Sequence, residues 1–179
     1  MVTLYSIGHS NKSLADFLSL LRINGIRALT DIRQFTRSRA NPQFNAETFP
    51  LALGENGIAY EHIKKLGGRR SSRLGDSPNA LWENEAFRSY ADYALGDEFE
   101  RGLAELLRFA QHGPAAMMCA EAVWWRCHRR IVTDYLLARG HHVLHILSEA
   151  EPKPGTLTPG AVIHDDGKIT YPPKQAQLL

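Results

Sequence analysis

The chain has 179 residues, of which 44% are hydrophobic and 22% charged, and its formal net charge is +2. This length and composition fit one globular domain with a hydrophobic core and leave little room for a second domain. The first residues lack the features of a signal peptide, and no apolar run reaches the roughly 18 to 20 residues of a membrane span. We therefore expect a cytoplasmic protein without a membrane partner.

Hydrophobic patterning in the first third of the chain predicts strands alternating with helices. Ser13 and Asp16 form a capping box, and Gly25 ends the helix that this box begins. The expected elements are a strand at 3–7, a helix from 13 to 24, a strand at 26–32, a helix at 46–56 and a strand at 58–63.

A polar, glycine-rich stretch at 64–80 is expected to be a mobile loop over a site. Beyond it we predict helices at 83–93 and 97–111, a strand at 115–119, a helix at 127–139 and a strand at 142–147. Asp166-Gly167 signals a hairpin in the tail. The predicted fold is a single three-layer α/β domain over residues 1–179, with a mostly parallel sheet of about five strands. Its core spans about 1–147 and its tail about 149–179.

Polar residues lie at the carboxyl ends of four of the predicted strands. Because ligands of parallel sheets bind beyond the carboxyl ends of the strands, we expect these residues to meet at one rim. They are His9 and Ser10, Asp31 and Arg33, His62, and Cys119 with Glu121.

Nine of the fifteen arginines gather in three loops. A planar guanidinium suits bidentate contacts to phosphate or carboxylate, so these loops predict anion binding; pairing with nearby acids or plain solvation is the alternative. Trp124, Trp125, Phe35 and Phe44 lie among the arginines, a combination typical of proteins that bind unstacked bases. The arginines are Arg33, Arg37, Arg39, Arg69, Arg70, Arg73, Arg126, Arg129 and Arg130.

Four residues are candidates for catalysis. Cys119 is a candidate nucleophile, although a buried and inert thiol is the common alternative. Glu121 is a candidate general acid or base, or a salt-bridge partner of Arg126 and Arg129. Asp31 either activates water or only orients Arg33, and His9 either exchanges protons or is structural.

Cys127 and His128 are expected at a helix N-terminus, where backbone amides attract anions and lower the pKa of a thiol. Cys119, Cys127 and His128, with His9 or His62, form a conceivable zinc tetrahedron. Their spacing is not that of a zinc site, however, so we expect neither a metal nor another cofactor.

Several motifs together resemble the DUF488 family over most of the chain up to about Leu147. They are Gly8-His9-Ser10, Asp31-Ile32-Arg33 with Ser38-Arg39, Leu66-Gly67-Gly68-Arg69, Cys119-Ala120-Glu121 and Cys127-His128-Arg129. Many members have an acidic residue and a proline after the glutamate, where this chain has Val123, Trp124 and Trp125. The resemblance implies these motifs as the site and a nucleic-acid-related enzyme, with DNA repair as a candidate process. It implies no particular reaction.

Together these observations predict an enzyme that acts on a nucleotide or nucleic acid by hydrolytic, glycosidic or phosphate-bond chemistry. Two alternatives remain open: a nucleic-acid-binding module without activity, and a cysteine-dependent small-molecule enzyme of rhodanese or phosphatase type. The predicted catalytic residues are Cys119, Glu121, Asp31 and His9. The predicted substrate or phosphate contacts are Ser10, Arg33, Arg37, Arg39, Gly67, Gly68, Arg69, Trp124, Trp125, Cys127, His128 and Arg129.

Overall fold

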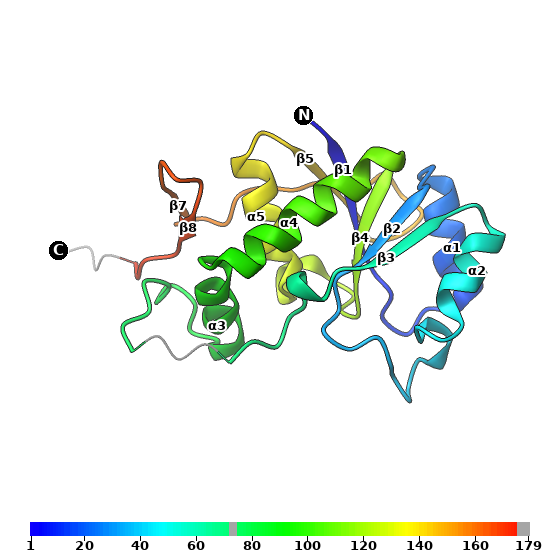
Figure 1. Ribbon diagram of the computed structural model, residues 1–179, viewed down its shortest axis with the longest axis horizontal. Coiled ribbons are helices and arrows are strands. Elements are labelled where there is room, and N and C mark those ends of the chain that lie inside the picture. The colour runs from blue at the N-terminus through cyan, green and yellow to red at the C-terminus, as the bar shows by residue number, and fades with distance from the viewer. Residues whose placement is uncertain (72–74, 175–179) are drawn as a thin grey trace.

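Strands and helices alternate along most of the chain, which confirms the predicted α/β class (Figure 1). The computed structural model describes residues 1–71 and 75–174, so Arg73 of the second arginine cluster lies outside the described residues. The main elements are β1 (Thr3–Gly8), α1 (Leu14–Ile23), β2 (Ala28–Asp31), α2 (Phe49–Glu55), β3 (Ala59–His62), α3 (Glu85–Ala94), α4 (Asp97–Phe109), β4 (Ala115–Cys119), α5 (Arg129–Ala138) and β5 (His142–Ile146).

The central sheet has the order β3-β2-β4-β1-β5-β6. Strands β1 to β5 are mutually parallel, and the two-residue edge strand β6 (Lys153–Pro154) pairs with β5 in the antiparallel sense. Within the described residues the sheet therefore has six strands, in agreement with the prediction of about five. The expected hairpin is present as β7 (Val162–Ile163) and β8 (Ile169–Thr170), with Gly167 in the left-handed region of its turn.

Hydrophobic side chains pack on both faces of the sheet, which makes the fold three layers deep. Helices α1 and α2 cover one face, where Ile7 of β1 and Met118 of β4 are buried. Helices α3, α4 and α5 cover the other face, where Leu4 and Met117 are buried (Figure 1). Alternate residues of β1 and β4 thus face opposite cores, as the period of a strand requires.

Local signals account for most helix ends. The Ser13 hydroxyl accepts a hydrogen bond from the Asp16 amide at 3.0 Å, and Gly25 follows the helix with a φ of 64°. Helix α2 begins at Phe49 rather than at the predicted residue 46, because Pro50 occupies the first turn, where a missing N–H costs nothing.

Four short 3-10 helices complete the path: η1 (Pro42–Phe44), η2 (Lys64–Leu66), η3 (Ala110–His112) and η4 (Trp124–Arg126). Among the described residues, no helix is long and apolar enough to cross a bilayer.

The segment after β5 returns to α5 and to the chain just before α3. The Tyr171 hydroxyl donates to Asp134 on α5 at 2.8 Å, and the Tyr171 amide donates to Asn79 at 2.9 Å. The Leu81 amide in turn donates to the Tyr171 carbonyl. Tyr171 is fully buried, so this segment is part of the core rather than a loose tail.

Hydrogen bonds continue beyond the strands at the carboxyl edge and fix the loops there. The His9 amide donates to the Cys119 carbonyl at 3.0 Å, and the Ser10 amide donates to the Ala120 carbonyl at 2.9 Å. The Ile32 amide donates to the Met118 carbonyl in the same way. Backbone hydrogen bonds alone therefore connect the loops after β1, β2 and β4.

Candidate functional site

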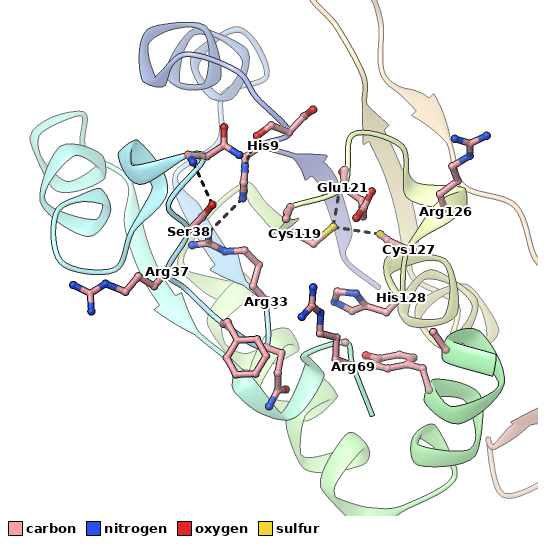
Figure 2. A pocket seen from close by; sticks show the side chains of 18 of the residues that line it. His9, Arg33, Arg37, Ser38, Arg69, Cys119, Glu121, Arg126, Cys127 and His128 are labelled. Atoms are coloured by element: carbon pink, nitrogen blue, oxygen red, sulfur yellow. Dashed lines mark hydrogen bonds between the residues drawn. The ribbon is translucent and has the colours of Figure 1, made fainter. Parts of the chain in front are cut away.

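A pocket of about 720 Å³ opens at the carboxyl edge of the sheet (Figure 2). The loops after β1, β2 and β4 form its floor, and the glycine-rich loop after η2 and the start of α3 form its side. Ten of the predicted site residues line it: His9, Ser10, Arg33, Arg37, Gly68, Arg69, Cys119, Glu121, Cys127 and His128.

Six other predicted site residues do not line this pocket. Arg39 borders a separate recess that it shares with Arg37 and Ser38. Asp31 and Arg129 lie beneath the pocket surface, and both are fully buried. The remaining three residues are Gly67, Trp124 and Trp125.

Asp31 holds Arg33 in place. The Arg33 Nε and Nη2 atoms donate to the two carboxylate oxygens at 2.9 and 2.6 Å, and the Tyr60 hydroxyl donates to Oδ2 at 2.8 Å. The carboxylate is 0% exposed and is saturated by these donors. Of the two roles expected for Asp31, the geometry therefore supports the orientation of Arg33, because a water molecule has no access to the carboxylate.

The two pocket histidines are neutral hydrogen-bonding groups. Nδ1 of His9 lies 2.7 Å from the Ser10 carbonyl, and its Nε2 lies 3.3 Å from Nη1 of Arg33. Nε2 of His128 lies 2.8 Å from the Ile32 carbonyl. Burial lowers the pKa of both histidines to about 4. Each imidazole donates to its carbonyl oxygen, so neither ring carries a proton that it readily gives up at neutral pH.

The two cysteines meet at the base of the pocket, with their sulfur atoms 3.3 Å apart (Figure 2). Both are free thiols in side chains that are almost fully buried. Burial raises the pKa of Cys119 well above its ordinary range. Burial also acts on Cys127, but the Cys119 hydrogen bond and the nearby Arg129 outweigh it and lower the pKa of Cys127 to about 6. Because Arg129 donates to the Cys127 sulfur through its amide and its Nε, Cys127 is the sulfur on which the thiolate form is favoured, and the Cys119 thiol lies within hydrogen-bond distance of it.

Arg129 supplies the positive charge that stabilises this thiolate. Its guanidinium is 0% exposed, and its Nε donates to the Cys127 sulfur at 3.1 Å. Nη2 donates to the Glu121 carbonyl at 2.6 Å, and Nη1 donates to the Ser6 hydroxyl at 3.2 Å. Within the described residues no carboxylate pairs with it. A guanidinium stays charged even when buried, so the thiolate is its counter-ion.

Glycines allow the close approaches that this arrangement needs. A Cβ atom on Gly8 would lie 1.8 Å from the Glu121 carbonyl oxygen and 2.9 Å from Nη2 of Arg129. A Cβ atom on Gly68 would lie 2.8 Å from Nδ1 of His128. The glycines of the Gly8-His9 and Gly67-Gly68 motifs therefore serve packing around the pocket.

Adjacent arginines of the glycine-rich loop have different roles. Arg70 donates to the carbonyls of Gly67 and Lys64 at 3.0 and 2.8 Å and stacks on the Tyr93 ring, so it holds the loop. Arg69 has a φ of 58° and turns toward the pocket (Figure 2). Arg126 lines the pocket from the opposite loop. Within the described residues, neither Arg69 nor Arg126 forms an ion pair.

The aromatic side chains of the pocket are not the expected tryptophans. Trp124 stacks face to face on His145, with ring centroids 4.1 Å apart, and Trp125 packs edge-on against Trp124. Trp125 is 44% exposed but lies outside the pocket lining. Phe35, whose ring is 62% exposed, takes the place on the pocket wall that we expected a tryptophan to hold.

Sequence reasoning missed the contribution of helix α3. Its residues Ala86, Phe87 and Tyr90 line the pocket. Tyr90 is also part of the core, since it is buried and its hydroxyl donates to the Leu66 carbonyl at 2.7 Å. Gln34 and Asn41 were also missed, and no motif marks them.

The zinc tetrahedron considered from the sequence is not assembled. His62 does not line the pocket that holds the cysteines, and its Nε2 is bonded to the Arg33 carbonyl at 2.8 Å. Nε2 of His9 faces Arg33, and Nε2 of His128 is bonded to a carbonyl. Across residues 1–71 and 75–174, no three side chains of the ligand types His, Cys, Asp and Glu are grouped to hold a metal ion.

A family model described as a domain of unknown function, DUF488, matches residues 13–136. No curated protein and no solved structure matches the chain. The matched range includes the arginine loop, the glycine-rich loop and both cysteines, but it excludes β1 and β5.

Proposed function

The chain belongs to the DUF488 family, which carries no assigned activity, and from its site we propose a cysteine-dependent enzyme that acts on a nucleotide or on nucleic acid. The observation that carries the proposal is the combination of one thiolate, Cys127, with two guanidiniums, Arg69 and Arg126, that form no ion pair within the described residues and lie around the same pocket.

The pocket has the dimensions and chemistry of a site for a phosphorylated, partly flat molecule. Its volume of about 720 Å³ lies within the usual range of roughly 300 to 1,000 Å³ for small-molecule sites. Arg69 and Arg126 supply charge for phosphate, and the exposed Phe35 ring supplies a surface for stacking. A nucleotide, free or at an accessible end or loop of a single strand, has both features.

The arrangement favours covalent catalysis over direct attack by water. Cys127 is the group poised as a nucleophile, while the buried Asp31 carboxylate is already bonded to Arg33 and Tyr60. In the proposed reaction, Sγ of Cys127 bonds to the electrophilic phosphorus or glycosidic carbon as the leaving group departs with its electron pair. Water then releases the product. Glu121, the only carboxylate among the pocket residues, is the candidate to transfer protons.

The test separates binding from turnover. Fluorescence anisotropy of a labelled short single-stranded oligonucleotide, with mononucleotides as competitors, should show binding that weakens with salt. Arg69→Ala should weaken it by about tenfold or more, because a charge-assisted hydrogen bond contributes roughly 1.5 to 3 kcal/mol. Arg101→Ala is the matched control, since Arg101 pairs with Glu98 on α4 outside the pocket.

Turnover is then sought with the ligands that bind. Cys127→Ser should keep the affinity within about twofold and abolish the reaction. Binding without turnover in the wild-type protein would instead support the nucleic-acid-binding module. The absence of binding to every oligonucleotide and nucleotide at low salt would refute the proposed substrate class and favour another small anionic molecule.

A further inference from the structure

The close approach of two sulfur atoms in an open pocket is a chemical feature that nucleophilic catalysis does not require. Cys119 ends β4 and Cys127 precedes α5, and the loop between them carries Glu121 and Arg126. Their sulfur atoms are 3.3 Å apart, so the bond of about 2.05 Å in a disulfide needs an approach of about 1.3 Å. Both thiols line the pocket that opens to solvent.

The surroundings divide the two thiols into an attacking and a resolving group. The Cys127 sulfur accepts hydrogen bonds from the Arg129 amide at 3.4 Å and from its Nε at 3.1 Å. The Cys119 sulfur faces Cys127 and lies 3.9 Å from the Glu121 carbonyl. Negative charge is thus stabilised on one sulfur, while the other keeps its proton until the first has reacted.

We propose that Cys127 and Cys119 form a reversible oxidation site for hydroperoxides, in which Cys127 is oxidised first and Cys119 resolves it as an intramolecular disulfide. This proposal does not depend on the substrate proposed above. Its test detects the Cys119–Cys127 disulfide directly by mass spectrometry and needs no substrate.

The chemistry is a two-electron oxidation in two steps. The Cys127 thiolate attacks one oxygen of the hydroperoxide, the O–O bond breaks, and the alkoxide or hydroxide that leaves takes a proton from solvent. Cys127 is then a sulfenic acid. The Cys119 sulfur next attacks the Cys127 sulfur and displaces hydroxide, which leaves as water with the proton lost by Cys119. The two thiols are oxidised to a disulfide, and the hydroperoxide is reduced to an alcohol or water, with one water released.

Oxidation would change the pocket as well as its nucleophile. A disulfide carries no charge, so the buried Arg129 guanidinium would lose its counter-ion while still bonded to the Glu121 carbonyl. The pocket would therefore lose the Cys127 thiolate on oxidation, and a dithiol reductant would restore it.

The experiment uses the folded, reduced protein and hydrogen peroxide. After treatment and blocking of the remaining thiols, trypsin should yield one disulfide-linked pair, residues 109–126 joined to residues 127–129. The longer peptide also contains Met117 and Met118, so the fragment masses distinguish the disulfide from methionine oxidation. The disulfide should form within one chain and should not link two chains, and dithiothreitol should reduce it. The rate should fall about tenfold between pH 7 and pH 5, because the thiolate fraction of Cys127 falls by that factor.

Two variants assign the order of events. Cys119→Ser should accumulate a sulfenic acid on Cys127 that dimedone captures, whereas Cys127→Ser should leave Cys119 unoxidised under the same conditions. Equal oxidation of Cys119 in the Cys127→Ser variant would overturn the assignment of the attacking thiol. Wild-type protein that keeps both thiols open to alkylation in the unfolded state after peroxide treatment, or that links only between chains, would overturn the oxidation site itself.

Discussion

Removal of the Arg129 charge should convert Cys127 from a thiolate to an ordinary buried thiol. Arg129 contacts the Cys127 sulfur through both its backbone amide and its Nε, and it is the cation next to that sulfur. In Arg129→Met the charge and the side-chain donor disappear, and burial then dominates. In Arg129→Lys the charge is kept, but the fork that also bonds Ser6 and the Glu121 carbonyl is lost.

The size of the effect follows from the pKa of Cys127. Its decrease from 9.0 to about 6 corresponds to about 4 kcal/mol of differential stabilisation of the thiolate. At pH 7, a pKa of about 6 leaves about 90% of the sulfur ionised, and a pKa of 9.0 leaves about 1%. The Cys119 hydrogen bond also lowers this pKa and remains in Arg129→Met, so this variant should slow alkylation of Cys127 at pH 7 by about 10- to 100-fold. Arg129→Lys should react at a rate between those of Arg129→Met and the wild type.

The assay is the rate of iodoacetamide modification as a function of pH, with the modified peptide identified by mass spectrometry. A buried guanidinium is hard to replace, so thermal unfolding must first show that each variant is folded; Arg129→Lys is the variant expected to tolerate the change better. A wild-type midpoint for Cys127 near pH 9, or a folded Arg129→Met variant that titrates like the wild type, would refute this role of Arg129.

Three further predictions concern stability. Gly8→Ala should cost about 3 kcal/mol, because its Cβ would lie 1.8 Å from a backbone oxygen; Gly54→Ala, with nothing within 4 Å, is the control and should be neutral or stabilising in urea unfolding. Burial lowers the pKa values of His9, His128 and His145 to about 4, 4 and 3. The free energy of unfolding should therefore decrease as the pH falls below 6.5, by roughly 3 to 4 kcal/mol per pH unit near pH 5. His145→Leu should reduce that slope by about a third, and an unchanged slope in urea titrations would contradict this account. Glu121→Gln should leave the urea midpoint within the equivalent of about 0.5 kcal/mol, since Arg129 bonds the backbone of this residue and not its carboxylate; a larger loss would show that the side chain is structural.

The regular elements were predictable because their signals are local. The Ser13 cap and Gly25 define α1, and strands such as 115–119 are continuous apolar runs, as expected for strands covered on both faces. Strand β6 was not predictable, because two residues that include Pro154 carry no periodicity. It exists only because the chain after β5 turns back along the edge of the sheet.

The location of the site was also predictable, since the carboxyl ends of parallel strands must share one edge. The roles within it were not. Asp31 ends a strand just as Cys119 does, yet its carboxylate is buried and hydrogen-bonded to Arg33 and Tyr60. Trp124 stacks on His145, and the spacing of these residues in the sequence does not indicate that contact. Whether a strand-end side chain enters a pocket depends on partners that are distant in sequence.

The identity of the thiolate shows this limit most clearly. From the sequence, Cys119 was the candidate nucleophile and Cys127 a residue for anion binding. We propose the reverse assignment, because Arg129, two residues after Cys127, folds back onto its sulfur through space left by the missing side chain of Gly8. That arrangement joins residues more than a hundred positions apart, so no local pattern encodes it.

The position of β1 in the sheet has a consequence for how the chain folds. Residues 3–8 leave the ribosome before the rest of the domain, yet they pair only with residues 115–119 on one side and 142–146 on the other. Until those strands are synthesised, Leu4 and Ile7 have no partners, and both edges of β1 stay open. Pairing at such long sequence separation is slow and exposes apolar segments to aggregation. We therefore expect refolding in the range of milliseconds to seconds or slower, and a nascent chain that needs protection until β5 has emerged.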